Sequence, residues 1–294
     1  MRVYALLSAL LLLCGFVRGQ GADRLLLGGS GWNKIAIVDK ATKKIVWEHP
    51  LEKGWECNSV AATPEGDILF SYARGAKLID REHREIWRVE VPDGCEMQTA
   101  RRLPDGNFLL AWCGHPSVIL EVNARGEEVS RTAYETGIEQ PHAQFRQVSK
   151  NTRGNYLLPL FATSEIREVS PAGELVKRIP VEGTPFCALG LPNGNYLVAC
   201  GDAHSFVELD CERGEVVRRV GANDIAGARL FFVAQLYPAA EGGLYICNWQ
   251  GHDSKAGGHD PQLIEIDQTG KIVWSLNDNA TFGMISSVCP IDEK

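Results

Sequence analysis

One sequence phrase recurs five times along the chain: a short strand pattern, a turn built on Pro and Gly, and a strongly apolar strand pattern. The five turn glycines are spaced alternately by 40 and 48 residues. A period of this length is typical of arrays in which each repeat forms one supersecondary unit. The copies are SVAATPEGDILFSY from Ser59, TARRLPDGNFLLAW from Thr99, FRQVSKNTRGNYLLPL from Phe145, CALGLPNGNYLVAC from Cys187 and VAQLYPAAEGGLYICN from Val233.

A second module follows each phrase and adds two more strands, as in VILEVNARGEEVSRT and LIEIDQTGKIVWSL. Each repeat therefore has four strands, the number found in a β-propeller blade. At the ends of the chain, residues 24–51 supply the last three strands of a sixth repeat, and SSVCPIDEK from Ser286 resembles its missing first strand. We therefore predict an all-β, six-bladed β-propeller whose N-terminal strands and C-terminal innermost strand share one blade, which removes two exposed sheet edges.

The N-terminal segment MRVYALLSALLLLCGFVRGQ has an early arginine, a short apolar run and small residues after it, the layout of a secretory signal peptide. We predict a signal peptide over residues 1–20, a propeller domain over 21–294, and a secreted or periplasmic monomer. Lipoprotein anchoring through Cys14 is the alternative. Later apolar runs are too short to span a bilayer, so no transmembrane segment is expected.

Charge and cysteine content exclude several classes of function. The formal net charge of -7 argues against nucleic-acid binding, because phosphates demand a basic surface. Eight cysteines follow the predicted signal peptide, and four of them lie in apolar strand patterns: Cys187, Cys200, Cys247 and Cys289. We expect mostly free, buried thiols. The absence of a CxxC pair removes support for a cysteine zinc site.

The modules IVDKATKKIVWEHPL and LIEIDQTGKIVWSL, together with LPDGNFLLAW and LPNGNYLVAC, resemble the repeats of PQQ-like and arylsulfotransferase-type propellers. The resemblance implies that the tryptophan near the end of a module packs between neighbouring blades. In the blades without this tryptophan, valines occupy the comparable position. The tryptophans are Trp47, Trp87 and Trp274, and the valines are Val129, Val176 and Val217. Six repeats and no adjacent cysteine pair argue against bound pyrroloquinoline quinone, so no cofactor is expected.

Alignment of the repeats predicts which residues lie at the entrance of the central channel. One half of the ring is polar and the other aromatic, which suits a ligand with a polar edge and an apolar face. Arg101 and Arg146 lie deeper on the polar side, as binders of carboxylate or sulfate or as counter-charges to Glu56 and Glu96. The predicted contacts are Trp55, Asn58, Gln98, Arg101, Gln144, Arg146, Phe186 and Phe232, with Trp32, Arg74 and Trp249 on loops of the same face.

These residues support a secreted propeller that binds a small polar, carbohydrate-derived ligand at the channel mouth. The first alternative is an enzyme: a sugar or lactone hydrolase or lyase in which His142, Glu56 and Glu96 are catalytic, or a sulfotransferase-like transferase that uses His142. The second alternative is a scaffold for another protein.

The long loop from Trp249 to Pro261 contains His252, Asp253 and His259. Imidazole and carboxylate groups bind divalent metals, which makes these three residues the metal candidates. Their spacing matches no standard motif, so no metal site is predicted.

Overall fold

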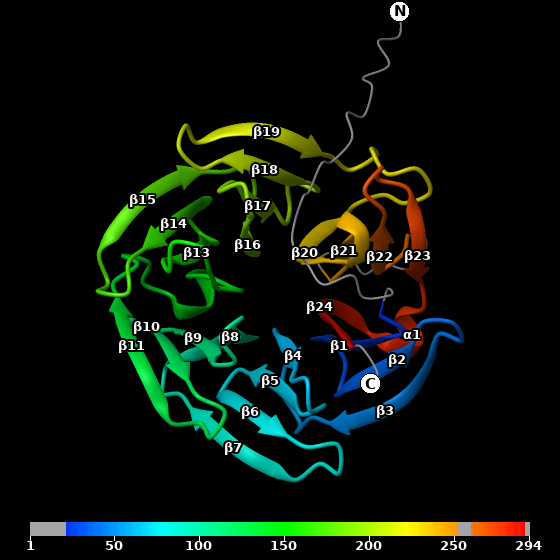
Figure 1. The fold of residues 1–294 in the computed structure, drawn as a ribbon, viewed down its shortest axis with the longest axis horizontal. Coiled ribbons are helices and arrows are strands. Elements are labelled where there is room, and N and C mark those ends of the chain that lie inside the picture. The colour runs from blue at the N-terminus through cyan, green and yellow to red at the C-terminus, as the bar shows by residue number, and fades with distance from the viewer. Residues whose placement is uncertain (1–21, 252–259, 292–294) are drawn as a thin grey trace, which may run out of the picture.

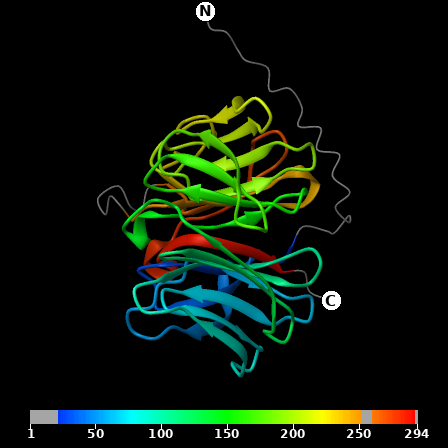
Figure 2. The same ribbon diagram turned by 90° about the vertical axis from the view of Figure 1, so that its left-hand side faces the viewer.

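The computed structural model describes residues 22–251 and 260–291. In this part of the chain, six four-stranded antiparallel sheets are arranged in a ring, which confirms the predicted six-bladed propeller (Figure 1). Seen on edge, the ring is a thick disc (Figure 2). The predicted signal peptide, including Cys14, lies outside the described residues.

The first three blades, each given from the innermost strand outward, cover the N-terminal half of the ring. Blade 1 contains β24 (Met284–Ile291), β1 (Arg24–Ser30), β2 (Lys34–Asp39) and β3 (Lys44–Pro50). Blade 2 contains β4 (Val60–Ala62), β5 (Ile68–Tyr72), β6 (Gly75–Ile79) and β7 (Glu85–Glu90). Blade 3 contains β8 (Glu96–Arg102), β9 (Phe108–Cys113), β10 (Ser117–Val122) and β11 (Glu128–Tyr134).

The other three blades complete the ring. Blade 4 contains β12 (Ser149–Lys150), β13 (Tyr156–Leu160), β14 (Glu165–Val169) and β15 (Leu175–Pro180). Blade 5 contains β16 (Cys187–Gly190), β17 (Tyr196–Ala199), β18 (Phe206–Asp210) and β19 (Glu215–Val220). Blade 6 contains β20 (Phe232–Pro238), β21 (Leu244–Trp249), β22 (Leu263–Ile266) and β23 (Ile272–Leu276). Three short helical turns lie between strands: η1 (Pro141–Ala143), η2 (Ala240–Gly242) and α1 (Asn279–Phe282).

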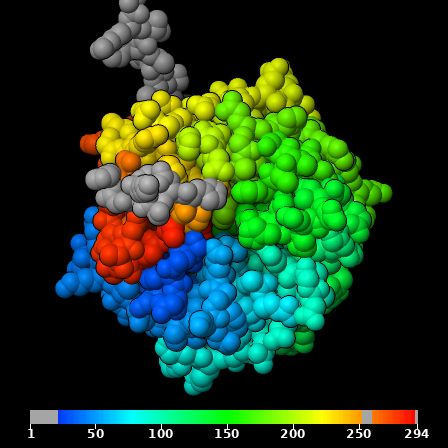
Figure 3. All heavy atoms as spheres, turned by 180° about the vertical axis from the view of Figure 1, so that it is seen from behind, coloured from blue at the N-terminus to red at the C-terminus, as the bar shows by residue number. Residues whose placement is uncertain are grey.

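The two ends of the described chain meet in blade 1, as the sequence predicts. Strand β24 pairs antiparallel with β1 from Arg24↔Ile291 to Ser30↔Met284, with one irregularity at Gly28 and Gly29. Figure 2 shows the red β24 alongside the blue strands, and Figure 3 shows the red and blue segments side by side from behind. The ring is thus closed by backbone hydrogen bonds between the first and last described strands.

The recurring Pro-Gly turn has the backbone conformation that its glycine permits. Gly106 has φ 91° and Gly194 has φ 88°, both in the left-handed region that residues with a Cβ avoid. Their N–H groups donate to Leu103 and Leu191 carbonyl oxygens, which closes the turn between the first and second strands of each blade. This turn chemistry explains why the phrase recurs from blade to blade.

Module tryptophans pack between blades, and each donates its indole N–H to a turn carbonyl of the next blade. Trp47 bonds Arg81 O at 2.9 Å, Trp87 bonds Ala124 O at 3.2 Å, and Trp274 bonds Lys40 O at 2.8 Å. These contacts agree with the packing implied by the resemblance.

The expectation for the three valines is wrong. Val129, Val176 and Val217 point outward and are 53%, 51% and 59% exposed. Strand register places Ser130, Lys177 and Arg218 at the tryptophan position instead. The error is one residue, which in a strand of period two reverses the face on which a side chain lies.

The hydrophobic core lies between adjacent sheets rather than in a single centre. One cluster joins Leu69 and Leu78 of blade 2 to Met97 and Leu110 of blade 3, another joins blades 4 and 5, and the largest extends over blades 5, 6 and 1. All eight cysteines of the described residues are free, and only Cys95 is not buried, which confirms the predicted thiols. No helix within residues 22–251 and 260–291 is long and apolar enough to cross a membrane.

Candidate functional site at the channel mouth

Five polar side chains form one chain of hydrogen bonds across three blades, and we call them the mouth cluster: Asn58, Glu96, Gln98, His142 and Arg146. Asn58 Nδ2 donates to Gln98 Oε1 at 3.1 Å, and Gln98 Nε2 donates to Glu96 Oε2 at 3.2 Å. The same carboxylate oxygen lies 2.8 Å from His142 Nδ1. The structure therefore brings together five of the residues that the sequence predicted for the site.

Both ring nitrogens of His142 have partners of defined polarity. A carboxylate only accepts hydrogen bonds and a guanidinium only donates them. Glu96 therefore accepts from Nδ1, while Arg146 NH2 donates to Nε2 at 3.2 Å. This arrangement fits a neutral imidazole with its proton on Nδ1. The side chain of His142 is 68% exposed and that of Glu96 is 33% exposed, so both are accessible to a ligand.

Arg146 joins the mouth cluster to a group of aromatic rings. Its NH1 donates to the carbonyl oxygen of His142 at 2.7 Å, and its guanidinium lies 4.7 Å from the centre of the Phe161 ring. Burial is the largest influence on its pKa and lowers it, while the charges of Glu96 and Glu56 act in the opposite direction. Arg146 is thus the counter-charge to two acidic residues, one of the two predicted roles.

The aromatic rings form a second contiguous group, which we call the aromatic wall: Phe161, Phe186, Phe232 and Trp249. Phe232 is at its centre, with ring centroids 6.4 Å from Phe161, 5.9 Å from Phe186 and 5.4 Å from Trp249. Trp249 Nε1 also donates to Ser30 Oγ at 2.7 Å, which fixes the indole against blade 1. Three of these four residues were predicted ligand contacts.

Arg101 lies one hydrogen-bonded step below the mouth cluster. Its NH2 donates to Gln147 Oε1 at 3.2 Å, and Gln147 Nε2 donates to the carbonyl oxygen of Asn58 at 2.8 Å. Burial lowers the pKa of Arg101, and the titratable groups that act on it are Cys187, Tyr237 and Cys289. Glu56 and Glu96, the predicted partners of this arginine as a counter-charge, are not in that set, and no ion pair within the described residues joins Arg101 to either of them.

Three further predicted site residues belong neither to the mouth cluster nor to the aromatic wall. Gln144 is fully buried, and its amide bonds Gly114, Ser117 and Ile138, so it holds the loop between β9 and β10. Glu56 is exposed and reaches the cluster only through its charge on Arg146. Arg74 is exposed and forms an ion pair with Asp93 at 2.8 Å.

Trp32 and Trp55 line a separate open groove of about 580 Å³ beside the mouth, together with Gly31, Asn33, Lys34, Glu52, Lys53, Gly54, Ala280 and Thr281. Trp55 stacks on Tyr72 with ring centroids 3.7 Å apart, and Trp32 meets Phe282 edge to face at 6.1 Å. Both indoles therefore also pack against the ends of the blades. The loop that carries Trp55 continues to Asn58, so groove and mouth cluster are adjacent.

Sequence reasoning missed two residues of the site, Phe161 and Gln147. Phe161 follows β13, in the loop between the second and third strands of blade 4, the same loop type that supplied other candidates. Gln147 is fully buried and lies two residues before the start of β12. The metal candidates His252, Asp253 and His259 lie outside the described residues, and within the described ranges no three His, Cys, Asp or Glu side chains are grouped to hold a metal.

The sequence model of the Mal s 1 allergenic protein-like family matches residues 30–271. The chain belongs to this family. The resemblance to PQQ-like and arylsulfotransferase-type repeats therefore holds for the propeller fold, whereas the family is a different one. No curated protein matches the sequence.

Solved structures agree with the fold. A protein of unknown function from Bacteroides caccae is 66% identical, with a TM-score of 0.89, over 92% of this chain and 100% of that chain. A catalytically inactive histidine-to-alanine variant of virginiamycin B lyase from Staphylococcus aureus, in complex with quinupristin, is 12% identical (TM-score 0.57; 88% of this chain, 87% of that chain). The WD40 propeller domain of Doa1 is 15% identical (TM-score 0.57; 76% and 71%). At such identities, the last two similarities concern the fold alone.

Proposed function

We propose that this chain is an exported binding propeller that takes up a small, carbohydrate-derived ligand at the channel mouth. The observation that carries the proposal is the contact of the Arg146 guanidinium with the Phe161 ring at 4.7 Å. Through this contact the mouth cluster, the polar half of the proposed site, adjoins the aromatic wall, its apolar half. In the wall, Phe161 and Trp249 are partly exposed, whereas Phe186 and Phe232 are buried. Sugars and glycosides have hydroxyl edges for the first half and C–H faces that stack on aromatic rings for the second.

The hydrogen-bonding groups of the mouth cluster suit a polyhydroxylated ligand. Glu96 accepts, Asn58 and Gln98 both donate and accept, and Arg146 donates, so neighbouring hydroxyl groups find partners of either kind. The exposure of His142 and Glu96 gives the ligand access from solvent. In pockets of this type, a few polar groups set specificity while aromatic contacts provide area.

Calorimetric titration of the full-length protein with a panel of glycans and phenyl glycosides tests the proposal. We expect binding that falls about tenfold or more in His142→Ala and in Phe161→Leu, since each removes an interaction of more than about 1.4 kcal/mol. Val217→Ser, on the exposed outer strand β19, is the matched control and should bind as wild type. The absence of binding to every compound of the panel, or wild-type affinity in both site variants, would contradict the proposal.

The pairing of Glu96 with His142 at 2.8 Å favours one second candidate, acid–base catalysis on a sugar or lactone. A carboxylate that orients an imidazole through Nδ1 leaves Nε2 to handle protons. In the present arrangement Nε2 is engaged by Arg146, so a substrate would first have to draw the guanidinium away.

Turnover assays separate catalysis from binding. For an enzyme, His142→Ala and Glu96→Gln should abolish product formation from glycoside or lactone substrates, with circular dichroism unchanged. A ligand that binds without turnover, with and without added divalent metal, would eliminate the catalytic candidate and leave the binding proposal intact.

A further inference from the structure

Arg101 is a cation on an innermost strand, and no carboxylate in the part of the chain that the structure describes forms an ion pair with it. It lies on β8, the innermost strand of blade 3, and its side chain makes one hydrogen bond among the described residues, to Gln147 Oε1. Its Nε is buried and has no acceptor in residues 22–251 and 260–291. The residue as a whole is partly exposed, but an N–H group that is shielded from solvent normally has an acceptor, because an unpaired buried donor is destabilising.

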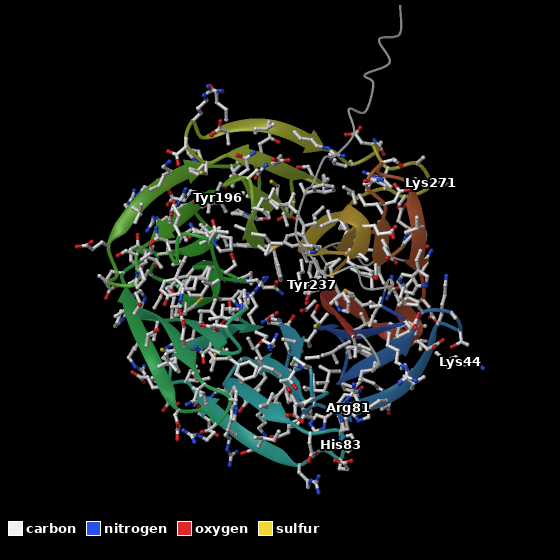
Figure 4. All side chains as sticks on the ribbon, viewed as in Figure 1. Lys44, Arg81, His83, Tyr196, Tyr237 and Lys271 are labelled. Carbon is white, nitrogen blue, oxygen red and sulfur yellow. The ribbon has the colours of Figure 1, made fainter. Side chains whose placement is uncertain are left out.

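The titratable groups near Arg101 lie on the innermost strands of three other blades. The groups that act on it electrostatically are Cys187 of β16, Tyr237 of β20 and Cys289 of β24. Figure 4 shows Tyr237 near the centre of the ring. Burial raises the pKa of the Cys187 thiol, which keeps that thiol neutral. The groups that act on the arginine are therefore two thiols and a phenol, and none of them is a carboxylate.

We propose that Arg101 binds the carboxylate of an acidic ligand inside the channel, so that the molecule taken up at the mouth is an acid such as a uronic-acid glycoside. This inference rests on the proposed function and specifies its ligand class. A carboxylate carries a single charge, which balances one guanidinium, and its two coplanar oxygens match the planar N–H fork. A doubly charged tetrahedral anion would leave one negative charge unbalanced among neutral groups.

Hydrogen bonds through Gln147 connect Arg101 to the mouth cluster. Gln147 is fully buried, accepts from Arg101 and donates to the carbonyl oxygen of Asn58. A ligand whose hydroxyl groups contact the mouth cluster is therefore separated from the Arg101 guanidinium by a single residue, Gln147. Arg146 is less suited to the same role, since it already donates to two carbonyl oxygens and balances Glu96 and Glu56.

The test compares two probes that differ only at one carbon: methyl β-glucuronide, which has a carboxylate, and methyl β-glucoside, which has a hydroxymethyl group. We expect the acid to bind the full-length protein about tenfold or more tightly than the neutral sugar, and Arg101→Gln to erase that difference. Arg102→Gln, the exposed neighbour on the same strand, is the control and should keep it.

A second measurement detects anion binding to wild-type protein, and the two variants serve only to assign the resonance. In ¹⁵N NMR spectra, sodium acetate should shift one arginine Nε–H resonance that is missing from Arg101→Gln and present in Arg102→Gln, whereas sodium sulfate at equal ionic strength should not. No acetate shift, or an equal shift with sulfate, overturns the inference.

The outcomes distinguish this inference from the function on which it rests. If both sugars bind equally and Arg101→Gln changes neither affinity, the carboxylate site is wrong while the binding function stands. If acetate shifts Arg101 but no sugar binds, the anion site is supported and the carbohydrate proposal fails.

Discussion

The hydroxyl of Tyr196 in blade 5 donates a 2.6 Å hydrogen bond to the buried carboxylate of Glu168 in blade 4. Tyr156 repeats the contact one blade earlier, with a 2.7 Å bond to Glu121 of blade 3. Burial is the main reason that the pKa of Tyr156 is raised to about 12, and the bond to Glu121 adds to it. These tyrosines tie adjacent blades together through their second and third strands.

Glu168→Gln should destabilise the protein by about 3 kcal/mol, because it removes one member of a buried charged network. The carboxylate accepts from Asn151, Asn155, Arg153 and Tyr196. Glu208→Gln, at the same register position in blade 5, is the control and should cost less than about 1 kcal/mol. Urea denaturation measures both, and equal losses would contradict the assigned role.

The same carboxylate predicts an acid-dependent loss of stability. Burial alone would raise the pKa of Glu168, but the hydrogen bonds and the charge of Arg153 outweigh it and lower the pKa below 4.5. A lowered carboxyl pKa contributes stability that is present above pH 4.5 and is lost as pH falls through the folded-state pKa. Denaturation at a series of pH values should therefore show that the free energy of unfolding falls less steeply below pH 4.5 for Glu168→Gln than for wild type.

His49 and His83 form a second pH-sensitive pair, at the outer boundary of blades 1 and 2. Their Nδ1 atoms are 3.0 Å apart, and both rings stack near Trp47. Burial lowers the pKa of His49 below 6.5, and the charges of His83 and Lys77 lower it further. NMR titration should find the His49 pKa below 6.5.

The variant His83→Asn should move the His49 pKa upward, because it removes one of the charges that oppose protonation. Asparagine tolerates the left-handed conformation of His83, whose φ is 68°. Figure 4 shows His83 at the outer edge of the ring, so the change leaves the channel untouched. An unchanged titration curve of His49 in this variant would show that the two rings do not interact.

Gly126→Ala should destabilise the protein by about 1–3 kcal/mol more than Gly137→Ala. Both glycines have positive φ, 78° and 73°, so the backbone cost is shared. A Cβ at Gly126 would lie 2.8 Å from Trp87 Cγ, whereas a Cβ at Gly137 would meet nothing within 4 Å. Thermal denaturation of the two variants isolates the contact between Trp87 and the next blade; equal melting temperatures would show that the indole can shift freely.

Native protein should react with iodoacetamide at Cys95 alone among the eight described cysteines. Burial raises the pKa of Cys57, Cys113 and Cys200 to about 12, which leaves almost no thiolate, the reactive form, at neutral pH. Mass spectrometry of labelled peptides should find modification at the half-buried Cys95 and none in Cys95→Ser. Native labelling of Cys57, or a disulfide-linked peptide, would contradict this expectation.

The propeller could be predicted from the sequence because the same strand and turn pattern occurs in successive blades. Each Pro-Gly turn, such as that ending at Gly106, fixes a strand boundary, and five copies give the period. Side-chain direction is harder. The exposed valines, such as Val129, correspond to Val46 and Val273, which directly precede Trp47 and Trp274 and are themselves exposed. A slip of one residue changed their predicted face.

The site was predicted in part for a similar reason. Repeat alignment brings Glu96, Gln98 and His142 to one rim, since backbone position decides that much. It does not show that the amide of Gln144 holds the loop between β9 and β10, or that the Phe161 ring contacts the guanidinium of Arg146. Those contacts depend on rotamers and on neighbouring blades.

The pairing of β24 with β1 also sets the order of assembly. Of the described strands, β24 is synthesised last, yet blade 1 has no innermost strand without it. A nascent chain in which all strands except β24 have been synthesised would still be an open ring. Any product terminated before Met284 would present β1 unpaired on one side, and such an exposed edge invites association with other chains and recognition by proteases.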